Sequence, residues 1–312
     1  MQKQFKQFSE NIRLTSAQED DALTKYSGVC KKLHSAYYET EYDGKTKLLF
    51  GSYKNKTSIR PLSDKHDVDV LFKIPKETFE RFKKYESNGP SALLQEVKNI
   101  LSEKYTTTDA IKAWGKVVLV KFSENAHNVE VLPAYEEEDG TFIIPNSENG
   151  GSWDKFDPRA QLAVFQNSNN TTTGLTSELA RIVKTWVDNT ASLNYKSFKS
   201  LNDVIAFLNT EFKNGAEYSE YSTVVKKFFQ YLKNNGDKEI ENYVNTALDR
   251  AKKACDFEAE NKPKEASEEW RKIFGFEGKS DFPSVAENPV NESNTRVFSN
   301  PSSPYGNYKV KW

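Results

Sequence analysis

The spacing of hydrophobic residues changes twice along the chain. Up to about residue 40 apolar residues recur at helical spacing, and Ser16 followed by Glu19 has the spacing of a capping box. From Lys45 onward short β-rich runs alternate with helical ones, whereas from Pro158 to about Phe274 only helical spacing remains. The chain is therefore predicted to contain a helical entry, an α/β half, a helical half and a tail.

The individual elements follow from the same pattern. In the α/β half, strands are predicted over Leu48–Phe50, Val68–Ile74, Val117–Phe122, Val129–Leu132 and Phe142–Ile144. Helices are predicted over Thr78–Tyr85 and over Ser91–Tyr105 with a Ser91 cap, followed by a loop at Asn146–Trp153. The helical half has apolar stripes through Leu179, Ile182, Val183 and Trp186, through Phe198, Leu201, Val204, Ile205 and Leu208, through Val225, Phe228, Phe229 and Leu232, and through Tyr243, Val244, Ala247 and Leu248.

Composition and charge narrow the class of protein. Of the 312 residues, 37% are hydrophobic and 29% are charged, which is typical of a soluble folded chain of one large or two modest domains. An apolar run of about 18 residues, a secretion signal and a CxxC pair are all missing from the sequence, so we expect the reducing cytoplasm and no membrane association. The formal net charge of −1 argues against stable nucleic-acid binding.

A pair of aspartates carries the clearest chemical signal. Asp67 and Asp69 are two residues apart on a predicted strand, so both side chains project from the same face, while Val68 and Val70 face the core. Two carboxylates this close repel each other unless a cation lies between them. Such a pair alone is also common on solvated strand edges, so further residues must decide between the two interpretations.

Two other segments favour a metal site. Glu130 lies between Val129 and Val131 on a second predicted strand, and three carboxylates on adjacent strands can hold two Mg²⁺ ions about 3.5–4 Å apart for in-line phosphoryl transfer, with Mn²⁺ able to substitute. Gly51-Ser52 precedes the aspartates; a glycine allows close approach of the backbone to phosphates, and a serine hydroxyl with amide groups can bind them. Asp67, Asp69 and Glu130 are therefore predicted to be the metal ligands and catalytic residues.

This order of motifs resembles the nucleotidyltransferase signature of the DNA polymerase β-like superfamily. The flanking residues resemble the bacterial CD-NTases, relatives of cyclic GMP–AMP synthase and oligoadenylate synthase that act in CBASS anti-phage systems. The similarity runs from about residue 45 to 283 and includes Thr57, Ile59, Pro61, Leu132-Pro133-Ala134, Ile144-Pro145, Trp153, Asp157-Pro158, Arg181, Lys184, Trp186, Ser197-Phe198, Leu201, Trp270, Ile273-Phe274-Gly275 and Phe282-Pro283.

The resemblance implies an α+β fold, with a polymerase β-like core and a helical C-terminal lobe forming a two-lobed cage. It implies N-terminal helices bracing both lobes over 1–44, the nucleotidyltransferase core over 45–157, a helical lobe like that of oligoadenylate synthase over 158–278, and a flexible tail over 279–312.

The resemblance also implies roles for single residues. Gly51 and Ser52 would hold the triphosphate, Lys184 and Ser197 would reach the phosphates from the helical lobe, and Phe198 would stack on a base. Phe198 equally fits the apolar stripe of its own predicted helix. Two positions depart from the family pattern: the third acid is Glu130 where aspartate is usual, and Asn202 stands where many relatives have glutamate.

The implied activity is synthesis of a cyclic di- or trinucleotide from nucleoside triphosphates with pyrophosphate release. The enzyme would be a monomer whose diffusible product reaches a separate effector protein. Two alternatives stay open at this point: transfer of a nucleotide to an antibiotic, a protein hydroxyl or an RNA 3′ end, and a non-catalytic nucleotide-binding protein of the same fold.

Overall fold

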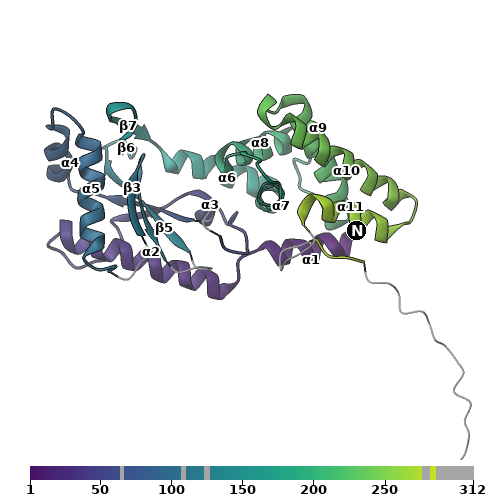
Figure 1. Ribbon diagram of the computed structural model, residues 1–312, viewed down its shortest axis with the longest axis horizontal. Helices are drawn as coiled ribbons and strands as arrows, with labels where there is room; N and C mark the ends of the chain where they lie inside the picture. Colours follow the sequence, from purple (N-terminus) through teal and green to yellow (C-terminus); the bar gives the residue numbers. More distant parts are fainter. Residues whose placement is uncertain (64–66, 107–109, 123–126, 276–281, 286–312) are drawn as a thin grey trace, which may run out of the picture.

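The computed structural model describes residues 1–63, 67–106, 110–122, 127–275 and 282–285. These residues form an elongated molecule with an α/β lobe at one end and a helical lobe at the other (Figure 1). Among them no helix is both long and apolar enough to cross a membrane. The expected α+β class with a helical C-terminal lobe is therefore observed.

The α/β lobe is built on a mixed sheet. Its strands are β1 (Lys47–Leu49), β2 (Asp67–Lys73), β3 (Ala110–Trp114), β4 (Val117–Lys121), β5 (Asn128–Glu136), β6 (Phe142–Asn146) and β7 (Ser152–Phe156). The order in the sheet is β1-β2-β5-β4-β3, and β6 pairs with the end of β5 and with β7. Of these pairs, β2 with β5 is parallel and the others are antiparallel.

One group of helices packs on one face of this sheet, and a second group forms the helical lobe. The first group comprises α2 (Ser16–Tyr37), α3 (Gly51–Lys54), α4 (Lys76–Lys83) and α5 (Gly89–Ser102). The second lobe contains α6 (Pro158–Thr171), α7 (Leu175–Asn189), α8 (Ser197–Thr210), α9 (Tyr221–Asn235), α10 (Glu241–Ala259), α11 (Pro263–Phe274) and the short 3-10 turns η2 (Tyr218–Glu220) and η3 (Lys238–Ile240), with another such turn, η1 (Glu148–Gly150), before β7. The N-terminal helix α1 (Gln2–Ile12) packs with this second lobe (Figure 1).

The core of the α/β lobe lies between the sheet and the helices α2 and α5. Val68 and Val70 of β2 and Val129 and Val131 of β5 are fully buried there, because alternate residues of a strand point to opposite faces. The residues that alternate with these valines, among them Asp67, Asp69 and Glu130, face away from these helices. That second face is apolar only toward the far ends of the strands, where Leu71 and Leu132 join a small separate cluster.

Aromatic residues hold the helical lobe together and include the N-terminal helix. Phe5 and Phe8 of α1 are fully buried against Trp270 and Phe274 of α11 and against Phe282. Phe282 falls within the segment expected to be a flexible tail. Its burial shows that the packed structure extends past the expected boundary, whereas 279–281 and 286–312 lie outside the described residues.

Several predicted boundaries were wrong. The capping box at the start of α2 is made by Thr15 and Gln18, one residue earlier than expected. Helix α5 begins with Gly89-Pro90, and Ser91 is not its cap. The expected loop at Asn146–Trp153 overlaps two strands, since β6 ends at Asn146 and β7 begins at Ser152; β3 was also missed. The five predicted strands and the two helices between them are confirmed within a few residues.

Buried charges join the two lobes next to the α1–α2 junction. Glu178 of α7 pairs with Arg181, at 2.7 Å between oxygen and nitrogen, and with Arg13. Arg181 is only 3% exposed and also donates to the carbonyl oxygen of Lys56, in the loop after α3. The helical lobe therefore holds this loop of the α/β lobe through a guanidinium group whose buried positive charge is neutralised by Glu178.

Replacement of Glu178 by glutamine tests this connection. The change leaves the buried Arg181 charge without its anion, so we expect the free energy of unfolding to fall by about 3–5 kcal/mol. Urea denaturation would measure the loss. Glu19→Gln is the control, because its ion pair with Lys56 is exposed and should contribute about 1 kcal/mol or less. Equal effects of the two changes would contradict the role given to Glu178.

Candidate active site

The parallel pairing of β2 with β5 brings the three predicted carboxylates to one face of the sheet. Asp69 is directly opposite Glu130 in the register, and Asp67 precedes Asp69 by two residues on the same face. The valines between them point to the opposite face and are fully buried. The rigid core thus fixes the backbone from which all three acidic side chains project.

The Gly51-Ser52 turn lies directly against Asp69. The Phe50 amide donates to the Asp69 carbonyl oxygen at 3.3 Å, and the Ser52 amide donates to the Asp69 carboxylate. Gly51 has a φ of +65°, and a Cβ atom at this position would lie 2.1 Å from Oδ2 of Asp69. Only glycine therefore permits this approach between the turn and the carboxylate.

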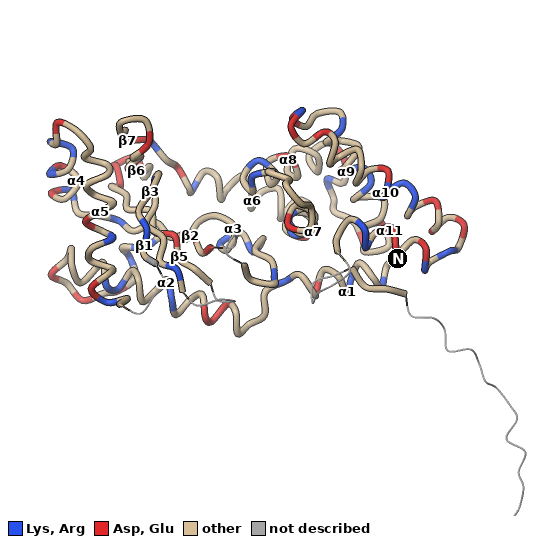
Figure 2. The backbone as a smooth tube through the Cα atoms, in the orientation of Figure 1, with Lys and Arg blue, Asp and Glu red and all other residues tan. Residues whose placement is uncertain are grey.

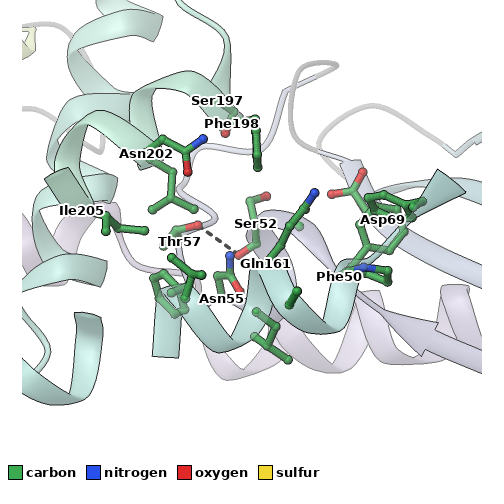
Figure 3. Close-up of a pocket in the computed structure, with 18 of the residues that line it drawn as sticks. Phe50, Ser52, Asn55, Thr57, Asp69, Gln161, Ser197, Phe198, Asn202 and Ile205 are labelled. Carbon is green, nitrogen blue, oxygen red and sulfur yellow. Dashed lines mark hydrogen bonds between the residues drawn. The ribbon is translucent and has the colours of Figure 1, made fainter. Parts of the chain in front are cut away.

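Hydrogen bonds within the following loop orient Ser52. Its hydroxyl oxygen is 3.1 Å from that of Ser58, and its carbonyl oxygen accepts from the Thr57 amide at 2.9 Å and from the Thr57 hydroxyl at 3.3 Å (Figure 3). The neighbouring Lys56 carbonyl is the group held by Arg181. The loop is therefore fixed at both of its ends, by the sheet and by the helical lobe.

Burial and repulsion between like charges raise the pKa values of Asp69 and Glu130. Burial raises the pKa of Asp69 to about 6; the positive charge of Lys184 opposes this shift, and Asp67 adds to it. Burial also raises the pKa of Glu130 to about 7, with further contributions from the negative charges of Asp67 and Asp69. Ionisation of Asp69 and Glu130 in the folded protein therefore costs free energy, which a bound cation would offset.

Lys184 extends from the helical lobe toward the acidic face, the side of β2 and β5 that carries Asp67, Asp69 and Glu130. Burial lowers the pKa of its amine to about 8, while the nearby carboxylates of Asp69 and Asp188 favour the charged form. The residue is partly buried on α7, one turn beyond Arg181. The same helix therefore contacts the loop that follows Ser52 (residues 55–58, here called the Ser52 loop) through Arg181, and it places the Lys184 cation within electrostatic reach of Asp69.

One cavity of about 680 Å³ contains all the predicted site residues. Figure 2 shows acidic positions at β2, on the side of the α/β lobe toward the helical lobe, and Figure 3 shows Asp69, Ser52, Ser197 and Phe198 around the cavity. The α/β lobe contributes Phe50, Gly51, Ser52, Asn55, Thr57, Asp67, Asp69, Glu130 and Phe156; α6 contributes Pro158, Ala160, Gln161, Leu162, Val164 and Phe165; and α7 and α8 contribute Lys184, Ser197, Phe198, Leu201, Asn202 and Ile205.

Phe198 does not belong to the core. Its side chain is 58% exposed and lines the cavity, whereas Val204 and Leu208 of the same predicted stripe are fully buried. The stripe on α8 extends beyond the edge of the core, so its first apolar residue meets the cavity. The sequence did not predict Asn55 and Gln161 as site residues, because isolated polar residues in loops and helices carry no distinguishing signal; Thr57 was part of the family pattern but had no role assigned to it.

The acidic face fits a divalent cation in its donor chemistry. As the side chains stand, no three carboxylate, histidine or cysteine residues in the described part of the chain are placed to hold a metal ion together. Carboxylate oxygens are suitable ligands for Mg²⁺, which also takes oxygens from substrate phosphates. Asp67, Asp69 and Glu130 would hold it.

Replacement of Glu130 by glutamine should show how much the ionised carboxylate destabilises the fold. The pKa of Glu130 is raised above its ordinary value of 4.5 in the folded state, so its ionisation destabilises the fold progressively as pH rises from about 4.5 through 7. In EDTA at pH 8 the variant should therefore be more stable than the wild type by about 1–3 kcal/mol, and the gain should shrink toward zero near pH 4.5.

Thermal unfolding across this pH range would measure the effect. Glu138→Gln, at an exposed position after β5, is the matched control and should change stability little at any pH. A Glu130→Gln variant that is less stable than the wild type at pH 8 would contradict the account of the site.

Comparison of this chain with known proteins, in sequence and in fold, leads to the same class of site. Residues 1–169, more than half of the chain, match the model of the Second Messenger Oligonucleotide or Dinucleotide Synthetase (SMODS) domain. A protein of Bacillus cereus (strain VD146) named "Probable cyclic nucleotide synthase" is 23% identical over 282 residues, which cover 76% of this chain and 83% of that protein.

Solved structures share the fold. DncV of Vibrio cholerae, a cyclic AMP-GMP synthase solved with the linear intermediate pppA(3′,5′)pG, gives a TM-score of 0.67 at 12% identity and covers 85% of this chain and 92% of its own. CdnC of Escherichia coli MS115-1, solved with ATP, gives a TM-score of 0.61 at 18% identity, covering 88% and 97%. The chain therefore belongs to the SMODS family, the bacterial CD-NTases, and is a nucleotidyltransferase of the cyclic nucleotide synthase type.

Proposed function

We propose that this enzyme joins nucleoside triphosphates into a cyclic di- or trinucleotide that acts as a second messenger in anti-phage (CBASS) signalling. The observation that carries the proposal is the single cavity shared by three carboxylates, the Ser52 loop, Lys184 and Phe198. Its volume of about 680 Å³ falls within the range of small-molecule sites. The product would diffuse to a separate effector, and the enzyme would act as a monomer in the cytoplasm.

The reaction consists of two or more similar displacements. The 2′- or 3′-hydroxyl oxygen of one nucleotide bonds to the α-phosphorus of another, the bond to pyrophosphate breaks, and the hydroxyl proton is released. A final attack within the linear product closes the ring and releases the last pyrophosphate. The linear pppA(3′,5′)pG bound to DncV supports such a stepwise course for the proposed reaction.

The protein contributes binding, orientation and charge. Asp67, Asp69 and Glu130 would hold two Mg²⁺ ions, which Mn²⁺ could replace. When bound, these ions favour ionisation of the attacking hydroxyl and neutralise the triphosphate.

Other cavity residues act on the nucleotides directly. Ser52, supported by its hydrogen bonds to Thr57 and Ser58, binds phosphate oxygens on one side of the cleft. Lys184 and Ser197 bind them on the other side, and Phe198 stacks on a base.

The structures of relatives with nucleotides support triphosphate substrates. CdnC was solved with ATP, and a CdnE cyclic dinucleotide synthase of Elizabethkingia meningoseptica was solved with GTP and Apcpp. The second of these gives a TM-score of 0.55 at 19% identity and covers 77% of this chain. Transfer to an antibiotic, a protein or an RNA end has no comparable support.

Product analysis tests the proposal. Purified protein incubated with all four labelled ribonucleotides and Mg²⁺ should release pyrophosphate and form a phosphatase-resistant oligonucleotide, identified by mass spectrometry. Asp67→Asn/Asp69→Asn removes two of the three negative ligands without changing side-chain size, so we expect it to lower the rate by at least about 1,000-fold.

The control is Asp249→Asn, at a position on α10 in the helical lobe outside the cavity residues, which should keep wild-type activity. Pyrophosphate release with only linear or acceptor-linked products would contradict the cyclase. Equal activity of the double variant and the wild type would contradict the assigned site.

A further inference from the structure

A second cavity lies where the two lobes and the N-terminal helices meet. Its volume is about 370 Å³, and its walls come from the α1–α2 junction, from α3 with the Ser52 loop, and from α7 (Figure 1). Among the described residues, none lines both this second cavity and the active-site cavity. The second cavity is therefore a space of its own.

The Ser52 loop forms the wall between the two cavities. Asn55 and Thr57 line the active-site cavity, whereas Lys56 and Ser58 line the second one. Alternate residues of the loop thus face opposite sides. The hydroxyl oxygen of Ser58 lies 3.1 Å from that of Ser52, so a single hydrogen bond links a residue of the second cavity to a residue of the active site.

Positive charge is concentrated around the second cavity. Arg13, Lys56 and Arg181 line it from three different segments of the chain, and Glu19 is the one acid among its described lining residues. The side chains of Arg13 and Lys56 are more than half exposed, so their charged groups can turn toward a bound molecule. Arg181 is buried and fixed in place by its contact with the carbonyl oxygen of Lys56.

The acidic partners of these cations leave donor groups available. Glu178 binds both arginines but does not line the second cavity. Nε of Arg181 is buried and has no hydrogen-bond partner among the described residues, a cost that a bound acceptor would remove. Lys56 and Glu19 form an exposed ion pair at 2.9 Å, and since such pairs contribute little, an anion can replace Glu19 at small cost.

The arrangement favours a phosphate group over other small anions. A phosphate group presents oxygens in several directions and can accept from three separate cations at once, whereas a carboxylate presents only two oxygens. Guanidinium groups bind phosphate oxygens through charge-assisted hydrogen bonds. A volume of about 370 Å³ admits a small molecule but not a folded partner.

We propose that the second cavity is a regulatory site for a small anion that carries a phosphate group, separate from the site of the substrate nucleotides. Arg13, Lys56 and Arg181 bind the phosphate oxygens. The anion thereby joins the α1–α2 junction, the Ser52 loop and α7, and it fixes the loop that orients Ser52. This site goes beyond the proposed function, because binding there requires neither metal nor turnover.

Pyrophosphate binding in metal-free buffer tests the site. Without metal the three carboxylates of the active-site cavity repel a polyanion, so titration calorimetry should detect only the second cavity. We expect the wild type to bind pyrophosphate at a single site per chain. Lys56→Gln removes one cation but keeps the backbone carbonyl that Arg181 holds, and it should weaken binding at least about fivefold.

Variants with opposite expected effects separate binding from folding. Glu19→Gln removes the lining acid and frees Lys56, so it should tighten pyrophosphate binding at least about twofold. Lys54→Gln makes the same change of charge at an exposed position of α3 outside both cavities and should leave the affinity unchanged. Lys184→Gln, in the active-site cavity, should also leave it unchanged.

Three results would overturn the site: no binding to the wild type, equal effects of Lys54→Gln and Lys56→Gln, or loss of binding with Lys184→Gln but not with Lys56→Gln. The last result would place the anion in the active-site cavity.

Titration with ATP in the same buffer distinguishes the two sources of a phosphate group. Tighter binding of ATP than of pyrophosphate, weakened by Lys56→Gln, would support a nucleotide as the ligand of the second cavity. Tighter binding of pyrophosphate, weakened by the same change, would support an inorganic anion.

Hydrogen exchange tests the link to the active site. Pyrophosphate should slow the exchange of backbone amides over residues 50–58 at least about threefold in the wild type, because the bound anion opposes local opening of the loop, but not in Lys56→Gln. Pyrophosphate binding with unchanged exchange over these residues would overturn the regulatory role.

Discussion

The parallel pairing between β2 and β5 is the constraint on which the rest of the site depends. It places Asp69 opposite Glu130 and Asp67 beside them, and the buried valines of both strands prevent the backbone from moving the charges apart. The raised pKa values of Asp69 and Glu130 express the resulting cost. Keeping like charges together costs electrostatic free energy. The positive charge of Lys184 offsets part of this cost, and metal ions bound together with a triphosphate would offset the rest.

The helical lobe is joined to this acidic face through one helix. Arg181 and Lys184 are three residues apart on α7; the first holds the carbonyl of Lys56, and the second lies near Asp69. Glu178, a further turn away, neutralises Arg181 and also binds Arg13 between α1 and α2. The loop after α3, the acidic face of β2 and β5 and the N-terminal helices therefore share a single support, and a shift of α7 would affect all three.

The sequence predicted those parts of the site that depend on local periodicity. Alternation along β2 and β5 placed the three acids on one face. Gly51 was expected to let the backbone approach phosphates; the structure shows its close approach to Asp69, which the sequence did not predict. The roles of these residues in metal and phosphate binding stay predictions. Motif order in the α/β half indicated the superfamily, and flanking residues in both halves indicated the family, which the matching SMODS domain confirms.

Features set by tertiary packing were not accessible in the same way. The apolar stripe of α8 could not show that Phe198 lies beyond the edge of the core, because periodicity defines a face but not where the covering helices end. The predominantly polar strand β7 gave no strand signal, and it is stabilised by pairing with β6. The amides of Asn55 and Gln161 become notable only when the cavity brings them together.

Anomalous diffraction from crystals grown with Mn²⁺ and the α,β-methylene analogue of ATP would test the central claim most directly. The account predicts anomalous peaks in contact with Asp67, Asp69 and Glu130, adjacent to the triphosphate and beside Ser52. Nucleotide bound in the cavity with no anomalous peak at these carboxylates, or with the metal held by other residues, would contradict it.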